Sequence, residues 1–308
     1  EGKIKYALGP LATKTTLLDI YEKIIKTEYR KFLNRIEKEA KNYSILINNA
    51  NEDDSIEKLE KPLFNLDKIQ GAPSYILLLY LLSNKDRLNL DNDIIANIIN
   101  YLTKFFVRRN ITDYPNTRNL TKIFMDLVSL IANKQGADIY DLIVNNLKNN
   151  SSSDEIFEEK LKGSIYLDNP DATRFLLCYY EDKFKTNEIY TNLWSRDKSN
   201  KYVWTIGENI ATDWIDMIAN GDKDLAIEYL NRYTHTLGNL TITGYNQNLS
   251  NLSFEKKKNR VNKDGNYIGY RNGLKLNEDV VNKDAWHIDD IKMRTNKLVD
   301  FFMKEFEL

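Results

Sequence analysis

The chain is poor in the residues from which many metal and redox sites are built. It has one cysteine and two histidines in 308 residues. A single cysteine excludes a disulfide within the chain and a cysteine-based zinc site, and two histidines exclude a histidine-rich metal site. Cys178, in the stretch RFLLCYYED, is interpreted as a small buried hydrophobic residue on a helix.

Long apolar runs are also absent. The longest, Tyr75–Leu82, is far too short to cross a membrane. The start, EGKIKYALGP, lacks the apolar core of a secretory signal, so we expect a cytoplasmic protein without a membrane partner. The 44 basic and 45 acidic residues nearly cancel, so any nucleic-acid binding would need a local basic face.

Apolar residues recur at helical spacing over most of the first 190 residues. The pattern predicts a long amphipathic helix over residues 11–50 and a buried helix at Tyr75–Leu82. Further helices are predicted at residues 91–107, 117–133, 137–148 and 154–162, and from Pro170 onward. Residues 1–195 are therefore predicted to form a multi-helix domain.

The pattern changes after residue 195. The stretch LGNLTITGYN, residues 237–246, is typical of a strand, and NLSNLSFEKKKN predicts a helix after it. Asp-Gly and Asn-Gly pairs in residues 262–273 indicate turns, and residues 285–306 predict a final helix with Trp286 and Phe302 inward. The chain is thus predicted to be mainly α, with a second module over residues 196–308.

Residues 234–251, THTLGNLTITGYNQNLSN, combine one of the two histidines with four asparagines. A strand, a turn and a helix with Asn at the turn form the second half of a ββα-metal finger. Phosphodiester cleavage by such a finger needs a general-base histidine, an Asn that orients the base, and a helix ligand for Mg²⁺. Asn can supply that ligand because Mg²⁺ accepts neutral amide oxygens.

The stretch HTLGNLTITGYNQNLSNLSFEKK resembles the HNH-type nuclease domain at the C-terminus of the GmrSD-like, modification-dependent restriction enzymes. Their pattern is roughly H-x-L-G-N-L-T-L, then an Asn, then S-N-x-x-F-x-x-K. The matching residues are His235, Leu237, Gly238, Asn239, Leu240, Thr241, Asn246, Ser250, Asn251, Phe254 and Lys257 or its neighbour Lys256. The resemblance covers roughly residues 60–308.

This resemblance implies a mainly α fold with a C-terminal ββα-metal, HNH-like module. It further implies a DNA endonuclease of a restriction or phage-defence system that uses Mg²⁺ or another divalent cation. The implied partners are DNA, possibly modified in its bases, and a ParB-like N-terminal nucleotide-handling domain of the same protein, which this chain lacks. A non-catalytic DNA-binding or protein-interaction module that retains the finger is the alternative.

The resemblance also implies roles for single residues. His235 and Asn239 are the candidate catalytic residues, with Asn239 expected to orient the base, and Asn246 and Asn251 are the candidate metal ligands. Three alternatives stay open: His235 as a structural histidine, Asn239 as a turn residue, and Asn251 as a helix N-cap.

A basic run follows the Asn-rich stretch. Lys256, Lys257, Lys258 and Arg260 are candidate contacts to DNA phosphates, and a solvated helix end is the alternative.

The family's His-x-x-Pro motif has no evident counterpart. It lies in a segment like E-H-I-x-P, and its His is the general base. The corresponding stretch here is YVWTIGENIATDW, residues 202–214, and we place a missing segment at the Ile206/Gly207 junction. Three explanations stay open: a segment that was not observed, a deletion introduced to inactivate the enzyme, and natural loss.

Overall fold

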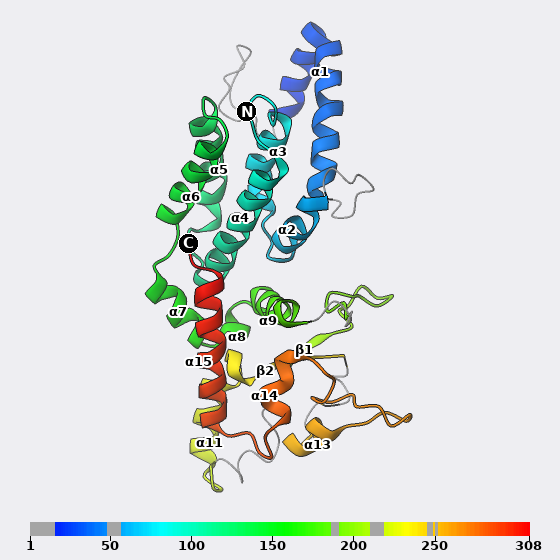
Figure 1. Ribbon diagram of the computed structural model, residues 1–308, viewed down its shortest axis with the longest axis vertical. Coiled ribbons are helices and arrows are strands. Elements are labelled where there is room, and N and C mark those ends of the chain that lie inside the picture. Colours follow the sequence, from blue (N-terminus) through cyan, green and yellow to red (C-terminus); the bar gives the residue numbers. More distant parts are fainter. Residues whose placement is uncertain (1–15, 48–56, 186–190, 210–218, 245–248, 250–251) are drawn as a thin grey trace. The chain divides into compact units, whose positions relative to one another are not determined.

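The computed structural model describes residues 16–47, 57–185, 191–209, 219–244, 249 and 252–308 (Figure 1). Over these residues the chain is mainly helical with one two-stranded sheet, which confirms the predicted fold class. It divides into a first compact unit up to residue 152 and a second from residue 153 to 307, to which residues 110–112 also belong. The predicted boundary at residue 195 lies inside the second unit, so a separate module over 196–308 stays a prediction.

The first unit is built from helices, all of which except α2 are predicted by the sequence pattern. They are α1 (Leu17–Ile47), α2 (Glu57–Lys68), α3 (Tyr75–Ser83), α4 (Asn92–Thr112), α5 (Thr117–Ile131) and α6 (Ala137–Asn149), with the short 3-10 turn η2 (Ala72–Ser74). Helix α3 packs against α1 and α5, and its Leu77, Leu78 and Leu81 are fully buried (Figure 1). In α1, by contrast, the predicted apolar face stays largely exposed, as at Leu18 and Tyr29.

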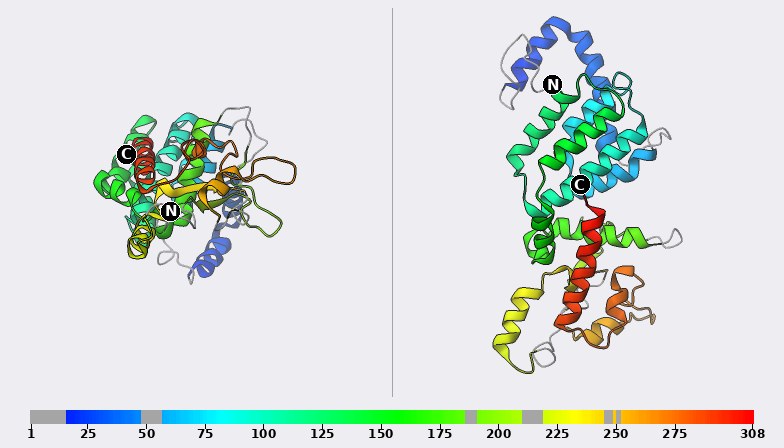
Figure 2. Two further views of the ribbon diagram at one scale, coloured as in Figure 1. Left: turned by 90° about the horizontal axis from the view of Figure 1, so that it is seen from below. Right: turned by 60° about the vertical axis from the view of Figure 1, so that its left-hand side comes forward.

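The second unit places a small sheet among short helices. Its helices are α7 (Asp154–Lys162), α8 (Ile165–Asp168), α9 (Pro170–Phe184), α11 (Lys223–Tyr233), α13 (Phe254–Asn259), α14 (Glu278–Val281) and α15 (Ile288–Glu305), and its 3-10 turns are η3 (Leu237–Asn239) and η4 (Lys275–Asn277). Strands β1 (Thr205–Glu208) and β2 (Leu240–Thr243) pair antiparallel. Helix α15 runs along η3, α7 and α11 and is drawn in red in Figures 1 and 2.

An apolar cluster joins the start of α15 to α13 and α14. The rings of Phe254 and Trp286 stack with centroids 6.0 Å apart, and Ile291 is fully buried beside them. Tyr229 and Tyr233 of α11 pack against the same cluster, and the right-hand view of Figure 2 shows α15 between these elements. Burial of these side chains is the main favourable term that holds the short elements together.

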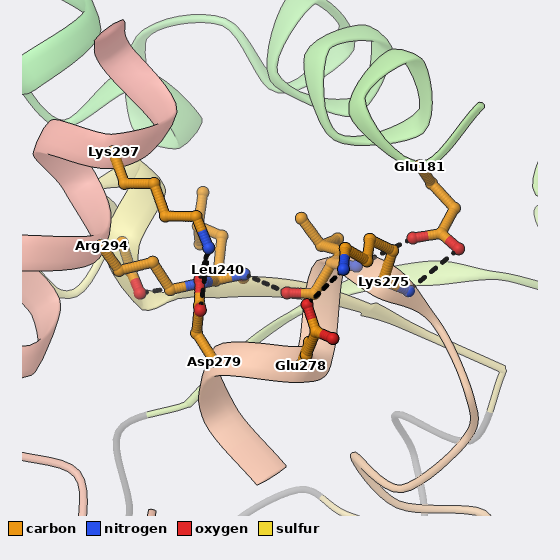
Figure 3. Close-up of polar contacts among 9 residues, drawn as sticks. Glu181, Leu240, Lys275, Glu278, Asp279, Arg294 and Lys297 are labelled. Atoms are coloured by element: carbon orange, nitrogen blue, oxygen red, sulfur yellow. Dashed lines mark hydrogen bonds and ion pairs between the residues drawn. The ribbon is translucent and has the colours of Figure 1, made fainter. Parts of the chain in front are cut away.

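Arg294 ties α15 to two separate pieces of chain, the continuous η3–β2 segment and η4. Its guanidinium is 3% exposed and donates to the carbonyl oxygens of Gly238 (2.8 Å), Leu240 (2.7 Å) and Leu276 (2.7 Å) (Figure 3). Burial lowers the pKa of this guanidinium to about 10, so it remains charged at neutral pH. No carboxylate in the described part of the chain forms an ion pair with it, so these carbonyl dipoles replace water around the charge.

Glu181 of α9 holds η4 from the opposite side. Its carboxylate accepts hydrogen bonds from the backbone N–H groups of Lys275 (3.1 Å) and Leu276 (2.8 Å) (Figure 3). Burial raises the pKa of Glu181, and the two N–H donors act in the opposite direction. Leu276 therefore bonds α9 through its N–H and α15 through its carbonyl.

Two expectations from composition can be compared with the structure. Cys178 is buried in α9 as predicted, and burial raises the pKa of its thiol to about 12, so the reactive thiolate does not form near neutral pH. None of the described helices is both long enough and apolar enough to cross a membrane.

Replacing Arg294 by Met should lower the free energy of unfolding by about 3 kcal/mol or more, because three buried carbonyls lose their donor. Lys292→Met is the matched control, since Lys292 lies on the same helix with a half-exposed side chain. Urea unfolding followed by circular dichroism measures both. Equal midpoints for the two variants would contradict the role given to Arg294.

Asp290 should make the unit sensitive to acid. Burial alone would raise the pKa of this carboxyl, but Lys283 (2.7 Å) and the His287 N–H (3.0 Å) outweigh it, and the pKa lies below the ordinary value of 3.8. A carboxyl with a lowered pKa stabilises the fold above its unfolded-state pKa, and this contribution is lost as pH falls through the folded-state pKa.

Asp290→Asn should therefore cost about 1 kcal/mol at pH 7, with the difference from the unsubstituted chain shrinking below about pH 4. Asp289→Asn, at a side chain that is 96% exposed, is the control and should change little at any pH. Denaturant unfolding at several pH values gives the comparison. A loss that stays constant down to pH 2 would argue against an ionic contribution.

Candidate functional site

Two of the predicted site residues, His235 and Asn239, lie at one end of the two-stranded sheet. Thr205 to Glu208 pair with Thr243 to Leu240, residue for residue. One step further, the Asn209 N–H donates to the Asn239 carbonyl at 2.8 Å, so the same register continues beyond the strands. Residues opposite each other in such a pair place their side chains on the same face.

Close packing against α15 fixes the turn that carries Asn239. The Gly238 N–H donates to Oγ1 of Thr295 at 3.0 Å, and the Gly238 carbonyl accepts from Arg294. A Cβ atom at Gly238 would collide with the backbone oxygen of Ile291 and with Thr295. Glycine is needed here for close approach to the helix, which explains its place between His235 and Asn239.

His235 contacts a carboxylate from β1. Its Nδ1 lies 3.1 Å from Oε1 of Glu208, without the alignment of a hydrogen bond, and both side chains are about one-third exposed. The His235 carbonyl accepts from the Tyr166 N–H at 3.2 Å, and the two rings lie 6.0 Å apart. The carboxylate and Tyr166 thus hold the imidazole at the edge of the site.

Asn209 and Asn239 carry buried polar atoms without partners. Both residues are 0% exposed. Nδ2 of Asn239 donates to the Thr234 carbonyl at 2.9 Å, but its Oδ1, and both side-chain polar atoms of Asn209, have no hydrogen-bond partner among the described residues. Such a group costs about 1–3 kcal/mol, and in native structures it calls for an explanation such as a bound ligand, ion or water.

The basic run does not form one exposed surface. Lys256 and Arg260 are exposed, whereas Lys257 and Lys258 are only 5% and 6% exposed. Lys257 Nζ donates to the Glu208 carbonyl at 3.0 Å. Lys258 Nζ donates to the Lys283 carbonyl, just after α14, at 2.6 Å. Lys257 and Lys258 thus serve as buried donors, and contact of this run with DNA phosphates stays a prediction.

The candidate metal ligands Asn246 and Asn251 lie outside the described residues. Within the described part of the chain no group of three or more His, Cys, Asp and Glu side chains gathers to hold a metal ion. The unpartnered Oδ1 of Asn239 and the Glu208 carboxylate at the same strand end are oxygen donors of the kind that Mg²⁺ prefers. In its donor chemistry the site fits Mg²⁺, and the ligand assignment stays a prediction.

A family model matches the part of the chain that holds this cluster. It is described as GmrSD restriction endonucleases, C-terminal domain, and it covers residues 151–301. Residues 151–301 are therefore similar to the C-terminal domains of this family. The matched range closely follows the second compact unit. No curated protein matches the chain.

Asn209 was not among the site residues predicted from the sequence. A signal was present, since Glu208, Asn209 and Ile210 match the first three positions of E-H-I-x-P with Asn in place of His. The structure makes that match visible because β1 pairs without a break through Ile206 and Gly207. Asn209 is the polar residue that follows the strand, and the missing segment at the Ile206/Gly207 junction stays a prediction.

Gly238→Ala should lower the free energy of unfolding by about 2 kcal/mol, because the added methyl group meets backbone and side-chain atoms of α15. Gly244→Ala is the control, since a Cβ there would meet only Trp204 ring atoms at 3.8–3.9 Å, an ordinary contact. Thermal unfolding of both variants tests the difference. A Gly238→Ala protein as stable as Gly244→Ala would show that this approach is not tight.

Proposed function

We propose that this chain is the nuclease part of a modification-dependent restriction or phage-defence system and hydrolyses DNA phosphodiesters with Mg²⁺. The observation that carries the proposal is the group of buried, unpartnered polar atoms at the end of the β1–β2 pair. These atoms lie in the segment that belongs to a restriction endonuclease family. Hydrolysis of this kind depends on donors and acceptors fixed where charge develops.

Asn239 would position the reacting groups. Its Nδ2 anchors the turn to the Thr234 carbonyl, which leaves Oδ1 directed to a ligand or water. His235, held against Glu208 through Nδ1, would use its other ring nitrogen to hydrogen-bond a phosphate oxygen. Both residues then act by orientation within a fixed frame.

Asn246 and Asn251 are proposed to hold the divalent cation. When bound, Mg²⁺ would stabilise negative charge on the scissile phosphate and on the leaving oxygen. Because amide oxygens are neutral ligands, an ion held this way keeps most of its charge for the phosphate.

DNA is the proposed partner of the exposed cations on α13. Lys256 and Arg260 are the members of the basic run that can reach a phosphate from the surface. Their contribution should weaken as salt rises, since phosphate contacts release condensed counterions. We further propose that the protein recognises modified DNA and cooperates with an N-terminal nucleotide-handling domain. Its proposed location is the cytoplasm.

A non-catalytic DNA-binding module is the second candidate. The observation that favours it is the carboxamide of Asn209 at the strand end, since an amide is not among the side chains that act as general bases. The two candidates share DNA binding and differ in hydrolysis.

Asn239→Ala should reduce Mg²⁺-dependent nicking of supercoiled plasmid by about 10²–10³-fold, since a positioned polar group is lost from the site. Asn266→Ala, at an exposed turn, is the matched control and should nick like the unsubstituted chain. Gel electrophoresis of the relaxed product gives the rate, and thermal unfolding checks that each variant is folded. Unchanged nicking by a folded Asn239→Ala protein would remove Asn239 from the site.

The proposed function itself has a separate test. The unsubstituted chain should bind duplex DNA at low salt, with affinity that falls as salt is raised. Failure to bind DNA at about 50 mM salt would overturn the proposed function.

A further inference from the structure

We propose that the guanidinium groups of Arg174 and Arg196, gathered at the ring of Tyr202, form a binding site for a phosphate group. Two sources share this chemistry, the backbone of a DNA strand and free inorganic phosphate, and the structure favours DNA. With DNA as the source, the inference rests on the proposed function and adds a contact to it. The site uses residues that precede β1 in the chain, whereas Glu208 ends that strand.

Both guanidinium groups lie close to one aromatic ring. The central carbon of the guanidinium is 3.7 Å from the centre of the Tyr202 ring for Arg174 and 3.9 Å for Arg196. Arg196 and Tyr202 also face each other in a β-bridge, which fixes the backbone of both. A tyrosine ring attracts a cation, but a second cation beside the same ring repels the first. The arrangement therefore concentrates positive charge.

Arg174 is buried with few hydrogen-bond partners. Its side chain lies in a residue that is 5% exposed, Nη2 donates to the Leu193 carbonyl, and Nε has no partner among the described residues. Nη1 forms no hydrogen bond with those residues either, and it is not fully enclosed. Arg294, by comparison, donates to three carbonyls. A buried guanidinium with so few acceptors points to a ligand that accepts from it.

The chain itself does not balance the two charges. No carboxylate within the described residues forms an ion pair with either arginine, and Arg196 donates to the Asn200 carbonyl at 2.8 Å. Burial lowers the pKa of Arg174, and the charge of Arg196 acts in the same direction, although Asp171 opposes both. An anion bound to both guanidinium groups would turn their repulsion into attraction.

A phosphate group fits such a pair. The planar fork of a guanidinium donates two parallel hydrogen bonds, and the oxygens of a phosphate accept them with matching geometry. Arg196 is exposed, so a phosphate reaches it directly from solvent. The aromatic side chains keep the guanidinium groups in place, since Trp194 lies edge-on to Tyr202 with ring centroids 6.0 Å apart.

The position of the cluster favours DNA as the source. Burial raises the pKa of Tyr166, Glu208 raises it further, and Arg174 lowers it, so Tyr166 feels charges from both places. The Tyr166 ring in turn lies 6.0 Å from the ring of His235. The cluster is thus an electrostatic neighbour of the candidate site, and a DNA strand carries phosphates along its whole length.

The first arm of the test measures binding of a fluorescein-labelled DNA duplex by fluorescence anisotropy at several salt concentrations. Arg196→Gln should weaken binding about 10-fold and reduce the salt dependence by about one ion, because one phosphate contact is lost. Arg196→Lys keeps the charge and should retain that salt dependence. Arg30→Gln is the matched control, since Arg30 is an exposed arginine beside a single tyrosine ring in α1 and should bind within about twofold.

The second arm tests inorganic phosphate alone. Thermal unfolding is compared in phosphate and in chloride of equal ionic strength, since a ligand that binds the folded state raises the melting temperature. A rise that Arg196→Gln abolishes, together with unchanged DNA affinity in that variant, would assign the site to free phosphate. The same melting curves show whether each variant is folded.

Equal loss of DNA affinity in Arg196→Gln and Arg30→Gln would overturn the inference, because any lost positive charge would then have the same effect. So would a folded Arg196→Gln protein that matches the unsubstituted chain in both arms. Failure of the unsubstituted chain to bind DNA would instead overturn the proposed function, and the phosphate arm would still decide whether the site exists.

Discussion

A buried guanidinium without a carboxylate partner is the constraint on which the second unit depends. Arg294 bonds carbonyls from η3, from β2 and from η4, so a shift of any of these segments away from α15 would leave a charge poorly solvated. Leu276 links the same bonds to Glu181 of α9. Short helices and a two-stranded sheet have little stability of their own, and this network gives them one fixed arrangement.

The rigidity of that frame permits unsatisfied polar groups at the strand end. Each such group costs about 1–3 kcal/mol, and an isolated hairpin could not carry it. Here the cost is offset by contacts outside the site, among them the stacked rings of Phe254 and Trp286. Lys257 belongs to the same frame, because its ammonium group bonds the backbone of β1. The residues that hold the fold together are therefore different from the candidate catalytic residues, although both groups lie close together in the sequence.

Periodicity predicted most of the helices, and the strand at residues 240–243 followed from its composition. Contacts that depend on distant parts of the chain could not be predicted from the local pattern. Nothing in the run of Lys257 and Lys258 indicates that carbonyls from elsewhere bury them. The pairing of His235 with Glu208 needs the register of β1 against β2, which no local pattern fixes. The exposed apolar face of α1 is a similar case, since amphipathicity does not say whether a face is covered.

Asn209 shows how fold and chemistry can separate at one position. Its main chain belongs to the fold, since its N–H extends the register of the sheet. Its side chain forms no bond with the described residues, so selection for stability alone would favour an apolar residue of similar size. An amide in that place keeps the ability to hydrogen-bond a ligand and gives up the ability to accept a proton. The backbone of residue 209 thus belongs to the frame that Arg294 ties together, whereas its side chain adds no hydrogen bond to that frame within the described residues.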